Sequence, residues 1–75
     1  MKSDIIQNAG PVVARLREKH GLTVEELAKK MGYDAERLAK IEAGEEAVGI
    51  EIVHDLATAL SMRQEFLILH FAMAR

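Results

Sequence analysis

The sequence has no cysteine and no tryptophan, and it has only one proline, one tyrosine and two phenylalanines. Without cysteine, neither a disulfide nor a thiolate zinc site can stabilise the chain, and the absence fits a reducing cytoplasm. The 75 residues are sized for one domain. A chain this short buries only about 60% of the surface that its unfolded form exposes, so association with a second copy is a stabiliser to look for.

Long apolar runs and an excess of basic residues are also missing. No apolar run approaches the ~20 residues of a membrane span, and the N-terminal stretch MKSDIIQNAG has no signal-peptide core. We therefore expect a soluble, cytoplasmic protein. The net charge of −2 is not the broad positive charge of a nucleic-acid binder, so DNA binding would need a local basic face.

What the sequence does have is an alternation of helix-forming and helix-ending signals. Pro11 suits the first turn of a helix that stops at Gly21. An apolar stripe continues backwards from Pro11, which leaves open a start at Ser3 with a kink at the proline. Thr23 and Glu26 predict a capping box for the second helix, in which each residue satisfies a backbone N–H of the other.

Three further helices follow. Asp34 is expected to cap the segment AERLAKIEA, which ends at Gly44, and Ser61 with Gln64 predicts a capping box for the segment MRQEFLILHFAMA. Between them, the segment IEIVHDLATAL is expected to bury Ile50, Val53, Leu56, Ala57 and Leu60. Five short helices without a strand signal predict an all-α fold.

The fifth predicted helix, at about residues 62–74, is apolar from position 66 onward except for His70. A helix that is apolar all round is buried all round, yet a terminal helix faces the core of its own domain on one side only. Two interpretations are open: a symmetric dimer covers the other side, or the helix plugs a larger core. The dimer interface would comprise Phe66, Leu69, His70 and Met73.

The second and third predicted helices are joined so tightly that they form a helix-turn-helix. Gly32 in the turn suits a positive φ, Ala28 permits close approach of the helices, and Leu38 and Ile41 face inward. With these features, the segments LREKHGLTVEELAKKMGY, IEAG and LATAL resemble the Cro/CI-type (XRE) helix-turn-helix family over roughly residues 10–67.

The resemblance implies a single lambda-repressor-like domain over residues 1–75, with the helix-turn-helix at 23–43. It also implies an ion pair between Arg17, near the end of the first helix, and Glu42, at the end of the third. A planar guanidinium binds a carboxylate through two parallel hydrogen bonds. We expect the pair to fix the angle between the two helices.

In the resembled family, the third helix lies in the major groove of DNA. Arg37 then suits guanine O6 and N7, Glu36 suits cytosine N4, and Ala35 suits a thymine methyl group. Lys40 would reach a phosphate or a guanine. Backbone groups at helix N-termini favour anions, and those expected to receive phosphate oxygens lie at Thr23, Val24 and Gly49.

The resemblance implies a transcriptional regulator, of which a repressor is the most common kind, with double-stranded DNA as its partner. A homodimer would read a roughly palindromic site with its two recognition helices about 34 Å apart. No cofactor or small-molecule ligand is indicated by the sequence.

Three positions depart from the family pattern. Val24 replaces a glutamine that commonly anchors the DNA backbone, Glu45 and Glu46 occupy a loop that is often basic, and Val48-Gly49 replaces Pro-Ser. Affinity for DNA depends mainly on phosphate neutralisation, so a second interpretation stays open, in which the fold is a protein–protein interaction module. The expected contact face carries four acids and two bases, namely Asp34, Glu36, Glu45 and Glu46 against Arg37 and Lys40.

The sequence does not predict an enzyme or a metal site. Glu51 and His54 have the Glu-x-x-His spacing of di-iron bundles, but only one copy is present. His20 and His70 have no nucleophile at a recognisable spacing, and there is no glycine-rich phosphate loop.

Overall fold

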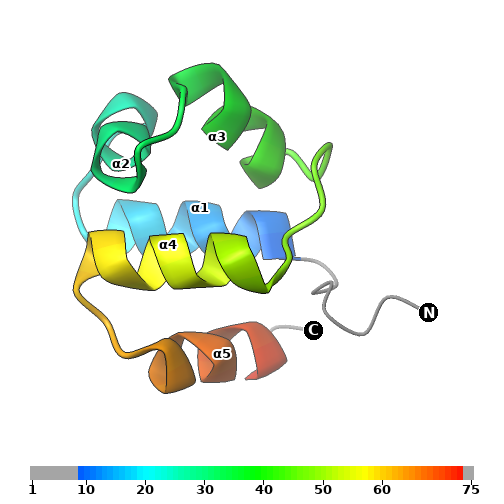
Figure 1. Ribbon diagram of the computed structural model, residues 1–75. Helices are drawn as coiled ribbons and strands as arrows, with labels where there is room; N and C mark the ends of the chain where they lie inside the picture. Colours follow the sequence, from blue (N-terminus) through cyan, green and yellow to red (C-terminus); the bar gives the residue numbers. More distant parts are fainter. Residues whose placement is uncertain (1–8, 74–75) are drawn as a thin grey trace.

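The computed structural model describes residues 9–73, which form helices and no strand, as the sequence predicted. The helices are connected by short turns and one longer loop (Figure 1). Their bounds are α1 at Ala9–Lys19, α2 at Val24–Met31, α3 at Ala35–Glu42, α4 at Ile50–Leu60 and α5 at Gln64–Met73. Within the described residues, no helix has the length and apolarity needed to cross a lipid bilayer.

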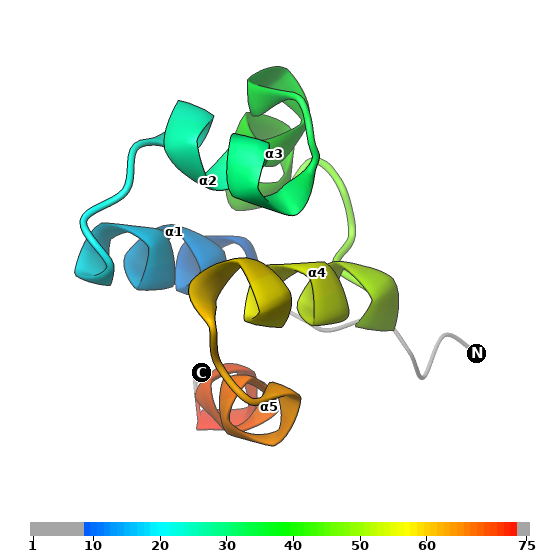
Figure 2. The ribbon, with the colours of Figure 1, turned by 60° about the vertical axis from the view of Figure 1, so that its left-hand side comes forward.

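The helices are arranged in three layers, which two views of the ribbon show consistently (Figures 1 and 2). Helices α2 and α3 form the upper layer, α1 and α4 the middle layer, and α5 lies beneath. Helix α3 packs against α1 and α2, and α5 packs against α4 and α1. The largest fully buried side chains come from all five helices and are Val13, Leu27, Leu38, Ile41, Val53, Leu56 and Leu67.

The turn between α2 and α3 has the geometry that the sequence predicted. The Thr23 hydroxyl accepts a hydrogen bond from the Glu26 N–H at 3.1 Å, and the Glu26 carboxylate accepts one from the Thr23 N–H at 2.8 Å, so the capping box is confirmed. Gly32 ends α2 with a φ of +78°, a conformation that only glycine adopts without strain. The Tyr33 N–H then donates to the Ala28 carbonyl at 2.8 Å, which directs the chain straight into α3.

The start of α3 differs from the expectation. Asp34 occupies the N-cap position with extended backbone, but its side chain makes no capping hydrogen bond. The Asp34 carboxylate therefore accepts no hydrogen bond from the backbone N–H groups that begin α3. At the other end, Gly44 has a φ of +82°, and the Glu45 N–H donates to the Lys40 carbonyl at 2.8 Å, as expected for a glycine-terminated helix.

The capping box predicted for the fifth helix is wrong. Ser61 ends α4 in the left-handed conformation, with a φ of +57°, and its N–H donates to carbonyls of the last turn. An N-cap residue needs extended backbone, so Ser61 cannot also begin α5. Helix α5 starts at Gln64 rather than 62 and is described to Met73; position 74 lies outside the described residues, as does the start at Ser3 left open for the first helix.

One core position of α4 also differs. Ile50 was expected in the core but is 46% exposed, and Ile52 is buried instead. Ile50 is the first residue of α4, and Val48 just before the helix and Ile52 within it both lie in the core, so the inward-facing positions at this end lie on either side of Ile50.

Helix α1 approaches the end of α3 very closely at Gly10. A Cβ atom placed on this residue would lie 2.7 Å from the carbonyl oxygens of both Ile41 and Glu42. Only glycine leaves room for this contact. The contact lies next to Glu42, whose side chain is part of the ion pair described below.

Candidate nucleic-acid interface

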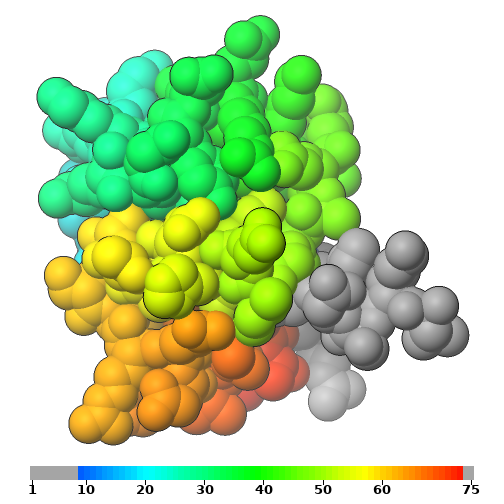
Figure 3. Space-filling model, in the orientation of Figure 1, coloured from blue at the N-terminus to red at the C-terminus, as the bar shows by residue number. Residues whose placement is uncertain are grey.

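Helix α3 presents an uncovered face because its buried side chains all lie on the opposite side. Leu38 and Ile41 are completely buried, while Glu36, Arg37 and Lys40 are exposed. In the space-filling view, α3 forms the upper edge of the molecule (Figure 3). Ala35 is half-buried rather than fully outward, and Ala39, which the sequence reasoning did not select, is exposed.

The N-terminus of α4 opens beside this face. Gly49 occupies the N-cap position, with extended backbone and no side chain to cap the first turn. A shallow hollow connects this position with α3 and is lined by Arg37, Gly49, Ile50, Glu51 and Ile52. The first N–H groups of a helix have no partner within the helix, so an acceptor from another molecule would find donors in this hollow.

The N-terminus of α2 is less open. The Thr23 hydroxyl and the Glu26 carboxylate satisfy backbone N–H groups there through the capping box. Val24 is half-buried and packs against the core. These contacts hold α2 in place, and the Thr23 side chain is already engaged within the protein.

Arg37 is not free. Its Nη2 donates to Glu46 Oε2 at 2.8 Å, and its Nε donates to both oxygens of Glu46 at 3.1 and 3.2 Å. Glu46 lies in the loop after α3, so the ion pair joins the exposed helix to its own C-terminal loop. The hydrogen bond from Arg37 holds the pKa of the Glu46 carboxyl below its usual range.

Tyr33 supports the guanidinium from below. The Arg37 guanidinium carbon lies 4.4 Å from the centre of the Tyr33 ring, within the range of a cation–π interaction. The Tyr33 hydroxyl donates to Asp55 Oδ2 of α4 at 2.7 Å. Burial, and then this hydrogen bond, raise the pKa of Tyr33 to about 12. Sequence spacing did not predict these contacts. Arg37 and Glu46 are 9 positions apart in the chain, and Tyr33 and Asp55 are 22 positions apart.

The remaining charges on this face are mostly acidic. Among residues 9–73, Lys40 makes no ion pair and is exposed, as are Asp34, Glu36 and Glu45. Lys29 and Lys30 are exposed on the neighbouring α2. Because Arg37 is paired with Glu46, the basic residues of α2 and α3 that make no ion pair with another described residue are Lys29, Lys30 and Lys40.

A second arginine–glutamate pair lies on the inner side of α3. Arg17 Nε donates to Glu42 Oε2 at 2.7 Å, and Arg17 Nη2 donates to Glu42 Oε1 at 3.2 Å. Arg17 Nη1 also donates to the Leu22 carbonyl at 2.9 Å. The hydrogen bond with Glu42 raises the pKa of the Arg17 guanidinium. The pair therefore links α1 to the end of α3 and to the loop before α2.

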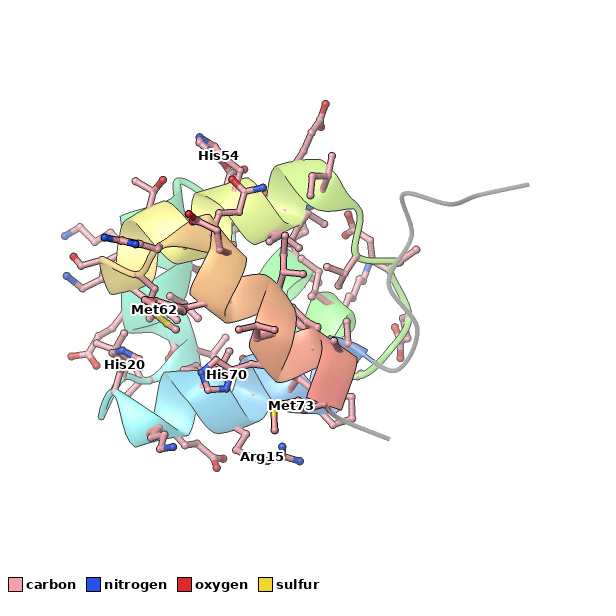
Figure 4. The ribbon with its side chains drawn as sticks, turned by 90° about the horizontal axis from the view of Figure 1, so that it is seen from below. Arg15, His20, His54, Met62, His70 and Met73 are labelled. Atoms are coloured by element: carbon pink, nitrogen blue, oxygen red, sulfur yellow. The ribbon has the colours of Figure 1, made fainter. Side chains whose placement is uncertain are left out.

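Helix α5 covers the core with one side and leaves the other side apolar and exposed. Leu67 and Phe71 are buried, whereas Phe66, Leu69 and Met73 are 55%, 53% and 79% exposed. A view from below shows α5 in front of the other helices, with His70 and Met73 projecting from it (Figure 4). The stripe of Phe66, Leu69, His70 and Met73, which we call the α5 stripe, is uncovered.

The described residues bring together no group of three side chains suited to a metal ion. His54 Nδ1 lies 3.4 Å from the side-chain oxygen of Gln64. His20 Nδ1 lies 2.9 Å from the Leu16 carbonyl. These contacts are local links between or within helices.

Comparison with known proteins agrees with the fold. The profile of a family described as helix-turn-helix matches residues 13–63, and the chain belongs to this helix-turn-helix family. Over 47 residues the chain is 40% identical to a protein of Thermococcus kodakarensis that is named as an HTH-type transcriptional regulatory protein. That match covers 63% of the chain but only 15% of the longer protein.

Two solved structures are also similar. The clp gene regulator ClgR from C. glutamicum matches with a TM-score of 0.75 and 25% identity, over 87% of each chain. The restriction-modification controller protein C.Esp1396I matches with a TM-score of 0.76 and 21% identity, over 84% of this chain and 81% of that one. The family and the fold are those of transcription regulators rather than of enzymes.

Proposed function

We propose that the protein is a DNA-binding transcriptional regulator that places α3 in the major groove. The observation that carries this proposal is the uncovered face of α3, on which Glu36, Arg37 and Lys40 are exposed and Arg37 also lines the hollow at the N-terminus of α4. Family membership supports it, and so does the similarity to a protein of Thermococcus kodakarensis that is named as an HTH-type transcriptional regulatory protein.

Each group on this face has a chemical counterpart in DNA. Arg37 and Lys40 suit guanine, Glu36 suits the amino group of cytosine, and Ala35 suits a thymine methyl group. The helix N-termini at Thr23–Val24 and Gly49 suit phosphate oxygens. The open hollow at Gly49 makes it the stronger of the two phosphate positions, because the Thr23 hydroxyl is occupied by the capping box.

We further propose that two copies associate through the α5 stripe. Three apolar side chains on this stripe are exposed to water. Fully burying such a side chain stabilises by roughly 1.5–3 kcal/mol, and about half of that gain is still open to Phe66 and Leu69, which are 55% and 53% exposed. A two-fold dimer lets the same stripe cover itself, and it would present two recognition helices to a roughly palindromic site. Repression needs only that such a dimer occupies a promoter, so we propose a cytoplasmic repressor that requires no cofactor or small-molecule ligand.

A second candidate function is a protein–protein interaction module. It is favoured by one observation, namely that Glu46 already neutralises Arg37 and leaves an acidic excess around α3. The acidic residues around α3 or the α5 stripe would then bind another protein, and the protein would not bind DNA.

Fluorescence anisotropy with a labelled duplex of mixed sequence separates the two functions. We expect binding at about 50 mM salt that weakens steadily as salt is added, because neutralised phosphates release counterions. Arg37→Ala should weaken binding, whereas Arg15→Ala, which removes the same charge from the exposed side of α1 that faces away from α4 (Figure 4), should not. Absence of binding at tens of micromolar protein would favour the interaction module.

Analytical ultracentrifugation tests the dimer separately. Phe66→Glu should convert a dimer into a folded monomer, because it places a charge within the proposed contact. Ile68→Glu is the matched control, since Ile68 is an exposed apolar residue of the same helix that lies off the α5 stripe. A wild-type protein that sediments as a monomer at tens of micromolar would contradict the dimer.

A further inference from the structure

Glu46 engages one side of the Arg37 guanidinium and leaves another side open. The carboxylate accepts hydrogen bonds from Nε and Nη2. Among residues 9–73, no acceptor is bonded to Nη1 of Arg37. The side chain of Arg37 is still 46% exposed, so the edge of the guanidinium that carries Nη1 remains available to another molecule.

Two further contacts restrict how the guanidinium can turn. The Tyr33 ring lies under it at 4.4 Å, and the Tyr33 hydroxyl is itself fastened to Asp55 at 2.7 Å. A guanidinium that is stacked on one face and bonded along one edge has a defined plane and a defined open edge. Arg37 therefore has little of the rotational freedom of an ordinary surface arginine.

The ion pair also changes what Arg37 attracts. Phosphates are anions, and their binding depends on the net charge that the protein brings to them. Next to Glu46 that net charge is close to zero. Guanine O6 and N7 are neutral acceptors, and their binding depends on the position of two N–H groups rather than on net charge.

We propose that Glu46 is a specificity-determining residue, which converts Arg37 from a general phosphate contact into a fixed donor for guanine. This inference rests on the proposed DNA-binding function and deepens it. Glu46 suppresses binding to DNA of arbitrary sequence, and the Tyr33 ring keeps the open edge of Arg37 in place. The acidic loop, which departs from the family pattern, is then part of recognition.

The test compares Glu46→Gln with Glu45→Gln. Both changes remove one negative charge from the same exposed loop, but only Glu46 is bonded to Arg37. Anisotropy is measured on a mixed-sequence duplex and on a duplex selected by the wild-type protein from a random pool. Circular dichroism melts check that both variants remain folded.

We expect Glu46→Gln to tighten binding to the mixed duplex by up to about fivefold more than Glu45→Gln does, which is the range for the loss of an exposed ion pair. The salt slope should become more negative by about 0.9, equivalent to one more neutralised phosphate. Binding to the selected duplex should tighten less, so that the specificity ratio falls. In an Arg37→Ala background, the two glutamine variants should behave alike.

Equal gains from the two glutamine variants would overturn the inference while leaving DNA binding intact, because only the charge of the loop would matter. Persistence of the extra gain in the Arg37→Ala background would overturn it as well. If the wild type selects no duplex from the random pool and neither it nor any variant binds the mixed duplex, the proposed function fails, and this inference fails with it.

Discussion

The protein contains two arginine–glutamate pairs with nearly the same hydrogen-bond chemistry on opposite sides of α3. In both, Nε and Nη2 of the arginine donate to the glutamate. The side chains of Arg17 and Glu42 are only 14% and 11% exposed, whereas those of Arg37 and Glu46 are 46% and 33% exposed. The inner pair links three segments of the fold, and the outer pair lies on the face proposed to meet DNA.

The difference shows how solvent decides what an ion pair does. A sheltered charge that loses its partner is left without water and destabilises the fold. An exposed charge that loses its partner is solvated, and such pairs contribute little to stability. The inner pair is therefore suited to hold the angle between α1 and α3, and the outer pair is suited to orient Arg37 on the surface while contributing little to stability.

The largest expected effect is that of breaking the inner pair. Arg17→Ala should reduce the free energy of unfolding by about 3 kcal/mol, since it leaves the sheltered Glu42 carboxylate unpaired. For a domain of this size, each kcal/mol lowers the melting temperature by roughly 4–8 °C. Arg15→Ala on the same helix, where the side chain is exposed, serves as the control. A melting temperature that falls equally in both variants would contradict a structural role for the pair.

The close contact at Gly10 provides a second test of the inner side. Glycine to alanine within a helix normally stabilises by roughly 0.5–1 kcal/mol. Here the added Cβ would meet two carbonyl oxygens at 2.7 Å, so Gly10→Ala should instead destabilise by about 1–3 kcal/mol, as overpacking does. Urea unfolding measures the sign directly, and a more stable variant would show that α1 and α3 lie farther apart.

The effect of salt on the melting temperatures of the variants should distinguish the two ion pairs. In 1 M salt the screening length is about 3 Å, so interactions between exposed charges are largely removed. Arg37→Ala should change the melting temperature much less than Arg17→Ala at low salt, and its small effect should disappear at 1 M. The effect of Arg17→Ala should persist. If the two variants respond to salt in the same way, exposure is not what distinguishes the pairs.

A test at alkaline pH concerns the Tyr33 ring, on which the guanidinium of the outer pair is stacked. Tyr33 is the only tyrosine and there is no tryptophan, so ultraviolet absorbance of the phenolate follows this one group. Its midpoint should lie near pH 12, compared with about 10 for an unperturbed tyrosine. Because the folded protein holds the proton more tightly, this contribution to stability is complete below pH 10 and is lost as the pH rises toward 12.

Asp55→Asn is the matched change for this titration. It should lower the pKa of Tyr33 only in part, because burial is the larger cause of the shift and remains. A midpoint that stays at pH 10 in the wild type would show that the ring is neither buried nor hydrogen-bonded to Asp55 in solution.

Local signals in the sequence predicted much of the upper layer. Thr23 with Glu26 and Gly32 with its positive φ act within a few residues, so their pattern is sufficient to predict the α2–α3 turn. The burial of Leu38 and Ile41 followed from helical periodicity. Ser61 shows the limit of such patterns, since the same residue can end one helix or begin another, and the left-handed end of α4 prevailed.

The contacts that organise the candidate site could not be predicted in this way. The pair of Arg37 with Glu46 depends on how the loop after Gly44 turns back, and the bond of Tyr33 to Asp55 depends on how α4 packs under α2. These are tertiary contacts between residues with no fixed spacing. The acidic residues of the loop, Glu45 and Glu46, are evident from the sequence. That Glu46 is bonded to Arg37, the arginine proposed to contact DNA bases, is not.

Titration of the isotope-labelled protein with duplex DNA, followed by backbone amide shifts in NMR spectra, tests most directly whether α3 is the recognition surface. If it is, the largest shifts will occur along Ala35–Lys40 and at Gly49–Glu51, and the amides of α5 will change little. Shifts confined to α5, or no shifts at low salt, would contradict the assignment of α3 as the recognition helix.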